Sequence, residues 1–440
     1  MIQNQSLKRR DVYLNRLIAF QDTEQVKVIT GIRRCGKSKL LDLMIEHLKN
    51  EGIPDAQILK MNFESHDFSG MTEGSFYEYV KEQVIPGKRK YLFFDELQRV
   101  VGWENAVNAF RVDMDCDIYI TGSNAYLLSS EYSTYLSGRY VEIKMLPLSF
   151  SEFLYFHGFG IKDSKSALGG TRKKVFDTSG ESYEIKEVFD AYLRFGGMPG
   201  LADVGLVQDR ALALLDSMYT TVIVRDILQR DKRFGLRKIT DQVLLEKLTT
   251  FLADNVGNMC SYTSIANTLV SSGMLKDESR KGNPGVHTIQ DYIFALMQAY
   301  FFYEAKRFDI KGKELLKTQS KFYIADIGFR NYLLGFRDVD RGHVLENIVY
   351  FELLRRGYNV TIGKVDNLEV DFRATKPNDV LYIQVTESMS LESVRDRELK
   401  PLKKISDSYD KIVLSYEKDL SDSYDGIKLI SLVEWLLGKY

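Results

Sequence analysis

The sequence predicts an α/β fold in which the strands of a parallel sheet alternate with helices. The first observation is the β-branched run Val26–Thr30, typical of a buried strand, which leads into a glycine-containing turn. The second is the segment 39–45, which predicts a helix directly after that turn. The third is a series of apolar runs at 57–64, 91–96 and 117–121, each of which predicts a further strand. Strand, turn and helix in this order indicate βαβ units.

The turn itself carries a phosphate-binding pattern. Residues 31–38 read Gly-Ile-Arg-Arg-Cys-Gly-Lys-Ser, which is the Walker A form. Gly31 and Gly36 allow the backbone to curl so that successive N–H groups point at a phosphate. Lys37 can reach the β- and γ-phosphates, and the Ser38 hydroxyl can ligate Mg²⁺. We therefore expect ATP and Mg²⁺ to bind here, through Gly31, Ile32, Arg33, Arg34, Cys35, Gly36, Lys37, Ser38 and Lys39.

The run 91–96 ends in two acids, Asp95 and Glu96. After a Walker A loop this is the Walker B form, in which Asp95 would hold Mg²⁺ beside Ser38. Glu96 would polarise the attacking water as a general base. An apolar strand that ends in Asp-Glu is common by itself, but its position after the phosphate loop favours the functional interpretation.

The strand at 117–121 runs into Ser123 and Asn124. A polar side chain at this strand end can lie between the γ-phosphate and the nucleophilic water. Both residues are candidates for this catalytic position, and we favour Asn124. In the alternative interpretation the side chain only caps the next helix.

Length and composition set the broad class. A chain of 440 residues is too long for one hydrophobic core and predicts roughly two to four domains. A net charge of −1 gives no general attraction to nucleic acid or membranes. The three cysteines are far apart, which fits a reducing cytosol. The first residues lack the apolar core of a signal peptide, and no apolar run is long enough to span a membrane. We predict a cytoplasmic protein without a membrane partner.

The motifs together resemble a known family. They are Gly-Ile-Arg-Arg-x-Gly-Lys-Ser, Phe-Phe-Asp-Glu, Thr-Gly-Ser-Asn-Ala, Ser137–Tyr140 and Leu146–Phe150. The series, which covers nearly the whole chain, resembles bacterial and archaeal AAA+-type ATP-binding proteins that are related to the archaeal ATPases. The resemblance implies an ATP-binding core over 1–160 with an extra strand between the Walker A and Walker B strands. It also implies a helical lid at about 183–235, and we interpret the polar segment 161–182 as a mobile insertion.

Arg139 is the candidate for an arginine that touches the γ-phosphate. Such a cation neutralises charge during phosphoryl transfer, and it comes from the same chain or from a neighbour in an oligomer. The alternative is an arginine bound to a local carboxylate. Arg33 and Arg34, within the phosphate loop, have the same two interpretations.

Residues 236–335 have a winged-helix layout. Helices are predicted at 262–269 and 286–293, and a strand pair follows near 300–307 and 315–323. The second helix contains Asp291 and no Lys or Arg, which is unfavourable for contact with phosphates. The strand pair is richer in cations, with Lys306, Arg307, Lys311, Lys313 and Lys317. Both DNA and a protein therefore remain possible partners.

Residues 336–440 resemble the PD-(D/E)xK nuclease core, in which a helix Glu, a strand Asp and an acid-x-Lys pair surround Mg²⁺. Glu346 and Asp371 are present, but Gln384 stands in place of the second acid and Thr386 in place of the lysine. Because strand side chains alternate between faces, Glu387 cannot readily substitute for either. We expect a nuclease-like domain with a vestigial site and without nuclease activity.

These features predict an ATP-hydrolysing switch or motor coupled to a winged helix and a degenerate nuclease-like domain. Two alternatives belong to other classes. One is a DNA-processing nuclease that uses ATP for loading, and the missing lysine argues against it. The other is a signalling scaffold that holds nucleotide with little turnover, in which Glu96 has a structural role.

Overall fold

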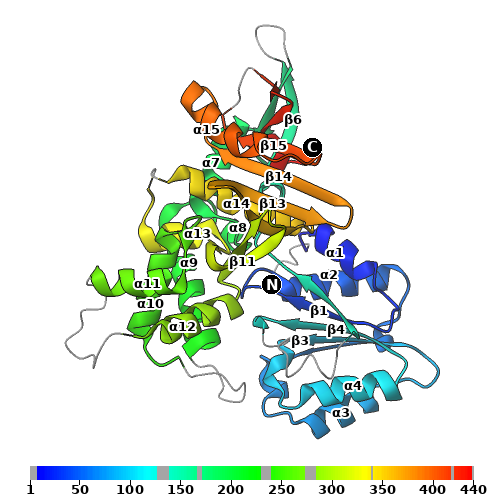
Figure 1. Cartoon of the computed structure of the whole chain (residues 1–440). Helices are drawn as coiled ribbons and strands as arrows, with labels where there is room; N and C mark the ends of the chain where they lie inside the picture. Colours follow the sequence, from blue (N-terminus) through cyan, green and yellow to red (C-terminus); the bar gives the residue numbers. More distant parts are fainter. Residues whose placement is uncertain are drawn as a thin grey trace. The chain divides into compact units, whose positions relative to one another are not determined.

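The computed structural model describes residues 7–125, 138–165, 171–228, 239–272, 284–337, 340–417 and 421–438 (Figure 1). The chain divides into two compact units, one of residues 1–146 with 298–300, the other of residues 147–297 with 301–440. None of the described helices has both the length and the apolar character that crossing a membrane requires. Because the second unit begins at residue 147, the domain boundary that we expected at residue 160 falls inside this unit.

The first unit contains a five-stranded parallel sheet. The strand order is β2 (Ile58–Asn62), β3 (Lys90–Asp95), β4 (Cys116–Gly122), β1 (Val26–Thr30), β5 (Tyr140–Lys144). The strand β4 lies between the Walker A strand β1 and the Walker B strand β3, so the extra strand implied by the resemblance is confirmed. Every residue of β1 and of β3 is buried, as the continuous apolar runs predicted.

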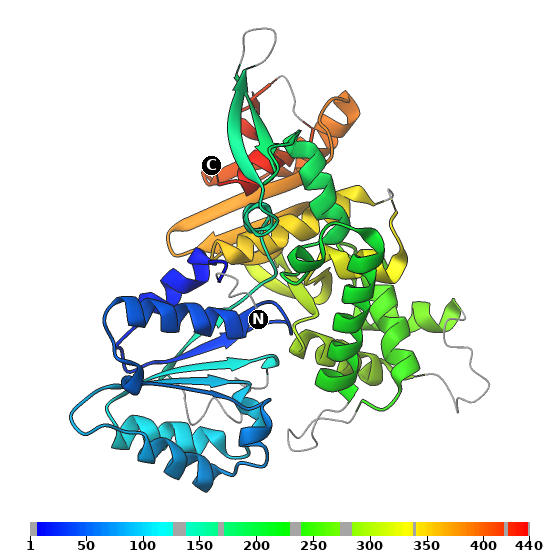
Figure 2. The same cartoon turned by 180° about the vertical axis from the view of Figure 1, so that it is seen from behind.

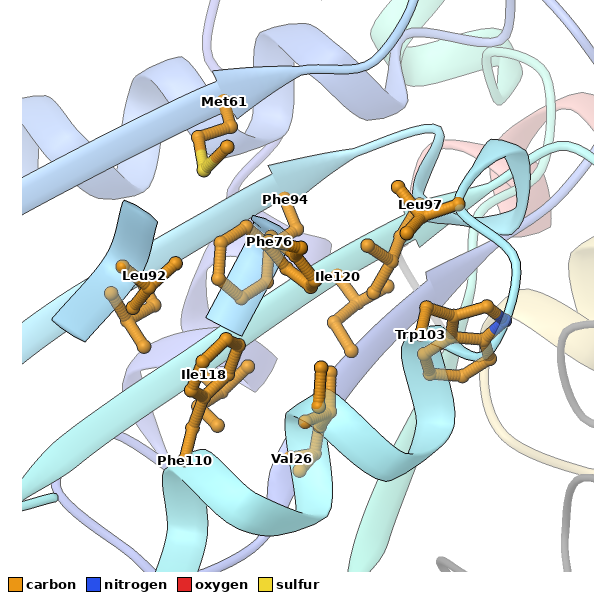
Figure 3. Close-up of a cluster of buried hydrophobic side chains, with 14 of the residues drawn as sticks. Val26, Met61, Phe76, Leu92, Phe94, Leu97, Trp103, Phe110, Ile118 and Ile120 are labelled. Carbon is orange, nitrogen blue, oxygen red and sulfur yellow. The ribbon is translucent and has the colours of Figure 1, made fainter. Parts of the chain in front are cut away.

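Helices cover both faces of this sheet (Figures 1 and 2). They are α1 (Asp11–Ile18), α2 (Lys37–Asn50), α3 (Glu73–Glu82) and α4 (Trp103–Asp113), with short 3₁₀ turns at 55–57, 66–68 and 97–99. On the face that α3 and α4 cover, Phe76 packs edge-to-face on Phe94 and Phe110, with ring centroids 4.9 Å and 5.1 Å apart (Figure 3). Burial of such large rings is the main stabilising contribution on this face.

The second unit contains a mixed sheet whose nine described strands run in the order β16, β17, β15, β14, β13, β12, β10, β11, β9. In chain order they are β9 (Met259–Cys260), β10 (Phe302–Asp309), β11 (Glu314–Ile324), β12 (Asn359–Val365), β13 (Leu368–Lys376), β14 (Asp379–Thr386), β15 (Asp410–Ser415), β16 (Ser423–Tyr424) and β17 (Ile427–Ser431). The parallel pairing of β10 with β12 joins the segment 236–335 to the segment 336–440. Residues 236–335 and residues 336–440, which we predicted from sequence to be separate domains, contribute strands to the same sheet.

The helices of the second unit are α6 (Phe150–Phe156), α7 (Ile185–Phe195), α8 (Leu201–Val204), α9 (Gln208–Thr221), α10 (Gln242–Asp254), α11 (Tyr262–Ser271), α12 (Val286–Gln298), α13 (Ile327–Leu334), α14 (Arg341–Arg355), α15 (Glu392–Lys403) and α16 (Leu432–Leu436). A π-helical stretch, Val222–Leu228, follows α9. The helix α6 packs on α7, with the Phe150 and Phe189 rings 5.0 Å apart. This aromatic contact and the hydrogen bond from Leu148 N to Gly197 O, at 2.7 Å, join the chain after residue 147 to the second unit.

The polar segment 161–182, which we interpreted from sequence as a mobile insertion, contains strands. It forms an antiparallel pair, β6 (Gly160–Lys165) with β7 (Thr171–Phe176), and β8 (Ser182–Tyr183) adds a third strand. Ladder hydrogen bonds satisfy the backbone here, although Gly, Ser and Lys in the sequence indicated a loop. Residues 166–170 of that prediction lie outside the described part of the chain, as do Ser137 and residues 229–235.

The glycine pair after α7 is explained by a buried aspartate. Asp326 caps α13, and its carboxylate accepts hydrogen bonds from Gly197 N at 2.6 Å and Gly328 N at 2.8 Å. A Cβ atom on Gly196 would lie 1.9 Å from Asp326 Oδ1, so no other residue fits. The glycines thus serve close packing between α7 and α13.

Candidate functional site

The phosphate loop lies between β1 and α2, where the sequence predicted it. Gly31 has a φ of 140°, and a Cβ atom there would lie 2.1 Å from Met145 O. Met145 in turn donates its N–H to Thr30 O at 2.7 Å, which holds the two segments together. Gly36, with a φ of 105°, precedes the first turn of α2. Positive φ angles at both positions, and the close approach of Met145 O at Gly31, therefore favour glycine there.

Lys37 is buried beneath the loop. Its ammonium donates to Gly31 O at 2.9 Å and to Ile32 O at 3.1 Å. Both acceptors are neutral, and no carboxylate in the described part of the chain forms an ion pair with Lys37. The full positive charge is therefore held inside the curl of the loop, where phosphate oxygens would sit.

Some of the other loop residues are buried against the rest of the domain, and others are exposed to solvent. Ile32 and Cys35 are fully buried. The Cys35 thiol points at Met145 O, 3.6 Å away, and its carbonyl accepts a 3.1 Å hydrogen bond from Arg10. Lys39 is 72% exposed and forms an ion pair with Asp42. Arg10, which also donates to Leu146 O at 2.9 Å, supports the loop and was missed because it lies 25 residues away in sequence.

The Walker B acids are anchored to the neighbouring strand. Asp95, buried at the end of β3, accepts a hydrogen bond from the Thr121 hydroxyl. The same hydroxyl accepts a 3.0 Å hydrogen bond from Glu96 N. Glu96 has a left-handed backbone, with a φ of 56°, so the chain turns sharply at this residue. Thr121 was not singled out from sequence, because Thr is an ordinary strand residue.

Glu96 is also held by its side chain. Its Oε2 atom accepts from the Ser123 hydroxyl at 3.1 Å and from Gln98 Nε2 at 2.6 Å. From sequence, Ser123 and Asn124 were both candidates for a position between the γ-phosphate and the attacking water, with Asn124 favoured; Ser123 contacts Glu96. Asn124 is half-buried, one residue further along.

Arg33 connects the loop to these strand ends. It lies 3.1 Å from Glu64 Oε1 and 3.9 Å from Glu96 Oε2. Arg99 contacts the same Glu64 oxygen at 3.0 Å. The sequence left open whether Arg33 contacts a phosphate or a local carboxylate, and in this structure it is bound to carboxylates. Arg34 is exposed, with a left-handed φ of 65°.

Arg139 lies at the opposite edge of the sheet. Its carbonyl accepts from the N–H of Val26, the first residue of β1, whereas the phosphate loop follows the last residue of that strand. Its guanidinium donates to Asn108 at 3.3 Å. Five strand residues span about 15 Å. Arg139 is therefore distant from the phosphate loop of its own chain, and of the sources that the sequence left open, this position disfavours the same chain.

A second cluster lies in the other unit. Glu346 on α14, Asp371 on β13 and Gln384 on β14 line a cavity of about 780 Å³. Gln384 Oε1 accepts from Asp371 N at 2.7 Å, and Val385 N donates to Asp371 Oδ2 at 2.8 Å. Thr386 Oγ1 donates to Ser388 O at 3.3 Å. The structure thus brings together the four residues that the nuclease resemblance selected.

Lys321 of β11 is part of this cluster and was missed. Its ammonium lies 2.9 Å from Glu346 and 2.7 Å from Glu369. Burial alone would lower the pKa of Lys321, but the facing carboxylates outweigh burial and raise it. Burial and the charge of Glu346 raise the pKa of Asp371 well above its usual range. Glu398, which accepts from Gln384 Nε2 at 2.8 Å, is a further acid of the cluster.

A parallel sheet with a Walker strand on each side of β4, a phosphate loop around a buried lysine and an anchored Asp-Glu pair define a phosphate-loop ATP-binding domain of the AAA type. Residues 23–154 match the AAA domain family, and residues 186–340 match a domain family of unknown function. The chain belongs to the same family as an uncharacterised protein of Haemophilus influenzae. The two are 38% identical over 432 residues, which cover 97% of this chain and 98% of that protein.

More distant proteins are similar over long stretches. An uncharacterised protein of Methanocaldococcus jannaschii is 29% identical over 412 residues, which cover 92% of this chain and 84% of that protein. Among solved structures, a Walker-type ATPase of Pyrococcus abyssi aligns with a TM-score of 0.48 at 13% identity, over 74% of this chain and 95% of that one.

Proposed function

We propose that this protein hydrolyses ATP with Mg²⁺ and acts as a nucleotide-driven switch or motor. The observation that carries the proposal is the anchoring of Asp95 and Glu96 to β4 through Thr121 and Ser123. A general base must be held within reach of the water it activates. One side chain of β4, Thr121, and one from the residue just after β4, Ser123, hold these acids at the edge where the phosphate loop begins.

The donor set fits Mg²⁺ and a triphosphate. The loop amides and Lys37 would bind the β- and γ-phosphates, and Ser38 with Asp95 would hold the cation. When bound, Mg²⁺ neutralises phosphate charge. Glu96 accepts a proton from the attacking water, and Ser123 keeps the carboxylate oriented. These roles explain why an acid is tolerated in a buried position at the end of β3.

Two residues, Arg139 and Arg33, are candidates for the arginine that neutralises charge on the phosphates. Arg139, at the far edge of the sheet, would act only on the nucleotide of a neighbouring copy in an oligomer. Arg33 is already within 3.9 Å of Glu96 and would need to release this carboxylate to face a phosphate. An oligomer whose assembly raises turnover would favour Arg139.

The second unit would transmit the nucleotide state to a partner. Its element order α10, β9, α11, α12, β10, β11 supports the winged-helix interpretation, with β9 pairing to β11 and β11 to β10. Basic residues on the β10–β11 hairpin include Lys306 and Arg307, whereas Lys311 is occupied by Asp366 at 2.5 Å. DNA or a protein would contact this hairpin, and the nuclease-like part would bind without cutting.

ATP turnover of the full chain, measured alone and with a panel of DNA and protein additives, tests this proposal. Turnover that Lys37→Ala abolishes and an additive raises several-fold supports a switch or motor. Nucleotide binding with no turnover under any condition would favour the scaffold instead. DNA cleavage that depends on ATP would favour the nuclease.

A further inference from the structure

The acidic cavity of the second unit is built around one buried lysine. Glu346, Glu369 and Asp371 converge on it from α14 and β13. The other acids of the cavity wall are accounted for separately: Glu398 pairs with Arg397 at 2.6 Å and Glu387 with Arg341 at 3.7 Å, whereas Asp340 and Glu417 are exposed. The buried carboxylate of Glu346 needs a cation beside it, because a buried negative charge is costly unless it is compensated.

Lys321 supplies that cation. Its side chain is 2% exposed, and its Nζ atom bridges Glu346 Oε2 and Glu369 Oε1 at 2.9 Å and 2.7 Å. The second oxygen of Glu346 is 3.2 Å from His343 Nδ1. Tyr323 also donates to Glu346, at 3.4 Å. Both oxygens of Glu346 are therefore engaged by protein groups.

The nuclease fold that this region resembles implies a divalent metal, and the residues present do not fit one. In the described ranges, no group of three or more His, Cys, Asp and Glu side chains is arranged to hold a metal ion. Gln384 places a neutral amide where a carboxylate would bind, and this amide is already bonded to Asp371 N and Glu398. Asp371 Oδ2 accepts from Val385 N.

We propose that the ammonium of Lys321 takes the place of the divalent cation in this cluster. The protein thus carries its own counter-ion, and the cluster is complete without metal. A dication would have to approach carboxylates that a fixed positive charge already binds, and the two cations would repel each other. These side chains then serve as a closed ionic centre that joins β11, α14 and β13.

Removal of the lysine should turn the cluster into a metal site. The full chain is titrated with Mn²⁺ in the absence of nucleotide, with free Mn²⁺ measured by electron paramagnetic resonance. Parent and variant both carry Asp95→Asn, so that the phosphate-loop site does not contribute. We expect Lys321→Met to bind Mn²⁺ at least tenfold more tightly than the parent, and Asp371→Asn added to it to abolish the gain.

Lys321→Arg is the matched control, because it keeps the positive charge and should gain no Mn²⁺ affinity. Thermal unfolding gives a second readout. Mn²⁺ should raise the melting temperature of Lys321→Met by several degrees and leave the parent unchanged. A folded Lys321→Met that binds Mn²⁺ no more tightly than the parent would overturn the proposal.

If Lys321→Met does not fold in metal-free buffer, refolding from denaturant decides. A native circular-dichroism spectrum recovered only when Mn²⁺ is present supports the substitution of lysine for metal. No recovery under either condition overturns it. The result is independent of ATP hydrolysis, since every readout concerns metal binding or folding rather than turnover.

Discussion

The Ser123 hydroxyl donates a 3.1 Å hydrogen bond to the Glu96 carboxylate. The contact links the residue that follows β4 to the residue that follows β3. The strand ends that carry the two residues are therefore joined by a side-chain contact as well as by the pairing of β3 with β4. Of the two adjacent polar residues Ser123 and Asn124, Ser123 is the one whose hydroxyl contacts Glu96 in this way.

Substitution of Lys37 should abolish triphosphate binding. Lys37→Ala removes the ammonium that now bonds to Gly31 O and Ile32 O, and we expect affinity to fall at least about a hundredfold, roughly 2.7 kcal/mol. Binding of a fluorescent ATP analogue measures this, and circular dichroism checks the fold. Lys49→Ala, at the other end of α2 in an ion pair with Asp55, is the matched control and should bind normally. A folded Lys37→Ala with unchanged affinity would refute the assignment.

Glu96→Gln should separate binding from turnover. The amide keeps the size of the side chain but cannot accept the proton of the attacking water. We expect ATP and Mg²⁺ binding to persist while turnover falls on the order of a hundredfold or more. Single-turnover measurement of phosphate release is the test. Hydrolysis at the parent rate would show that the base lies elsewhere and that Glu96 is structural.

Ser123→Ala should affect turnover more than Asn124→Ala. Loss of the hydroxyl frees one side of the Glu96 carboxylate, and we expect kcat to fall about tenfold, about 1.4 kcal/mol in the barrier. ATP affinity should stay within about twofold, because Ser123 contacts Glu96 rather than the loop. Steady-state kinetics of Ser123→Ala and Asn124→Ala show which of the two residues contributes more to kcat. A larger loss in Asn124→Ala would restore the preference drawn from sequence.

The purified protein should not cut DNA. Gln384 and Thr386 are neutral where an acid and a lysine would be needed, and metal-dependent cleavage requires several carboxylates around the ion. Linear, circular, branched and single-stranded DNA, incubated with Mg²⁺ or Mn²⁺ and with or without ATP, should remain intact on gels. Cleavage that disappears in Asp371→Ala would give the nuclease alternative first place.

Asp326 should make the second unit less stable as pH rises. Burial raises the pKa of Asp326 to about 7, although the N–H groups of Gly197 and Gly328 oppose the shift. In the unfolded chain the pKa is about 3.9. Between these values the folded state holds a proton that the unfolded state has lost, so the free energy of unfolding decreases with pH, by up to about 1.4 kcal/mol per pH unit.

Denaturant unfolding of the parent and of Asp326→Asn at pH 5, 6 and 7 isolates this contribution. The amide does not ionise, so the stability advantage of the parent over the variant should shrink as pH rises from 5 to 7. A constant difference across this range would mean that the carboxylate is ionised throughout, held by its two N–H donors.

Local features of the chain were predicted well from sequence. The strand Val26–Thr30, the loop and the first turn of α2 are contiguous, and loop geometry depends on two glycines whose backbone freedom belongs to the residue itself. The extra strand β4 was predicted correctly through a family resemblance. The strands β6 and β7 were missed, because pairing partners rather than intrinsic preference decide whether a polar segment becomes a strand.

Tertiary structure alone decided which distant side chains meet. Thr121 reaches Asp95 and Ser123 reaches Glu96 because β4 lies beside β3, and Arg139 is placed at the wrong edge of the sheet by the direction of β5. Lys321 enters the carboxylate cluster from a hairpin that the sequence assigned to another domain. Charge interactions act through space and are indifferent to chain separation, so the chemistry of a single loop could be predicted from sequence, whereas the cation of the second cluster became visible only when β11 and α14 were placed together.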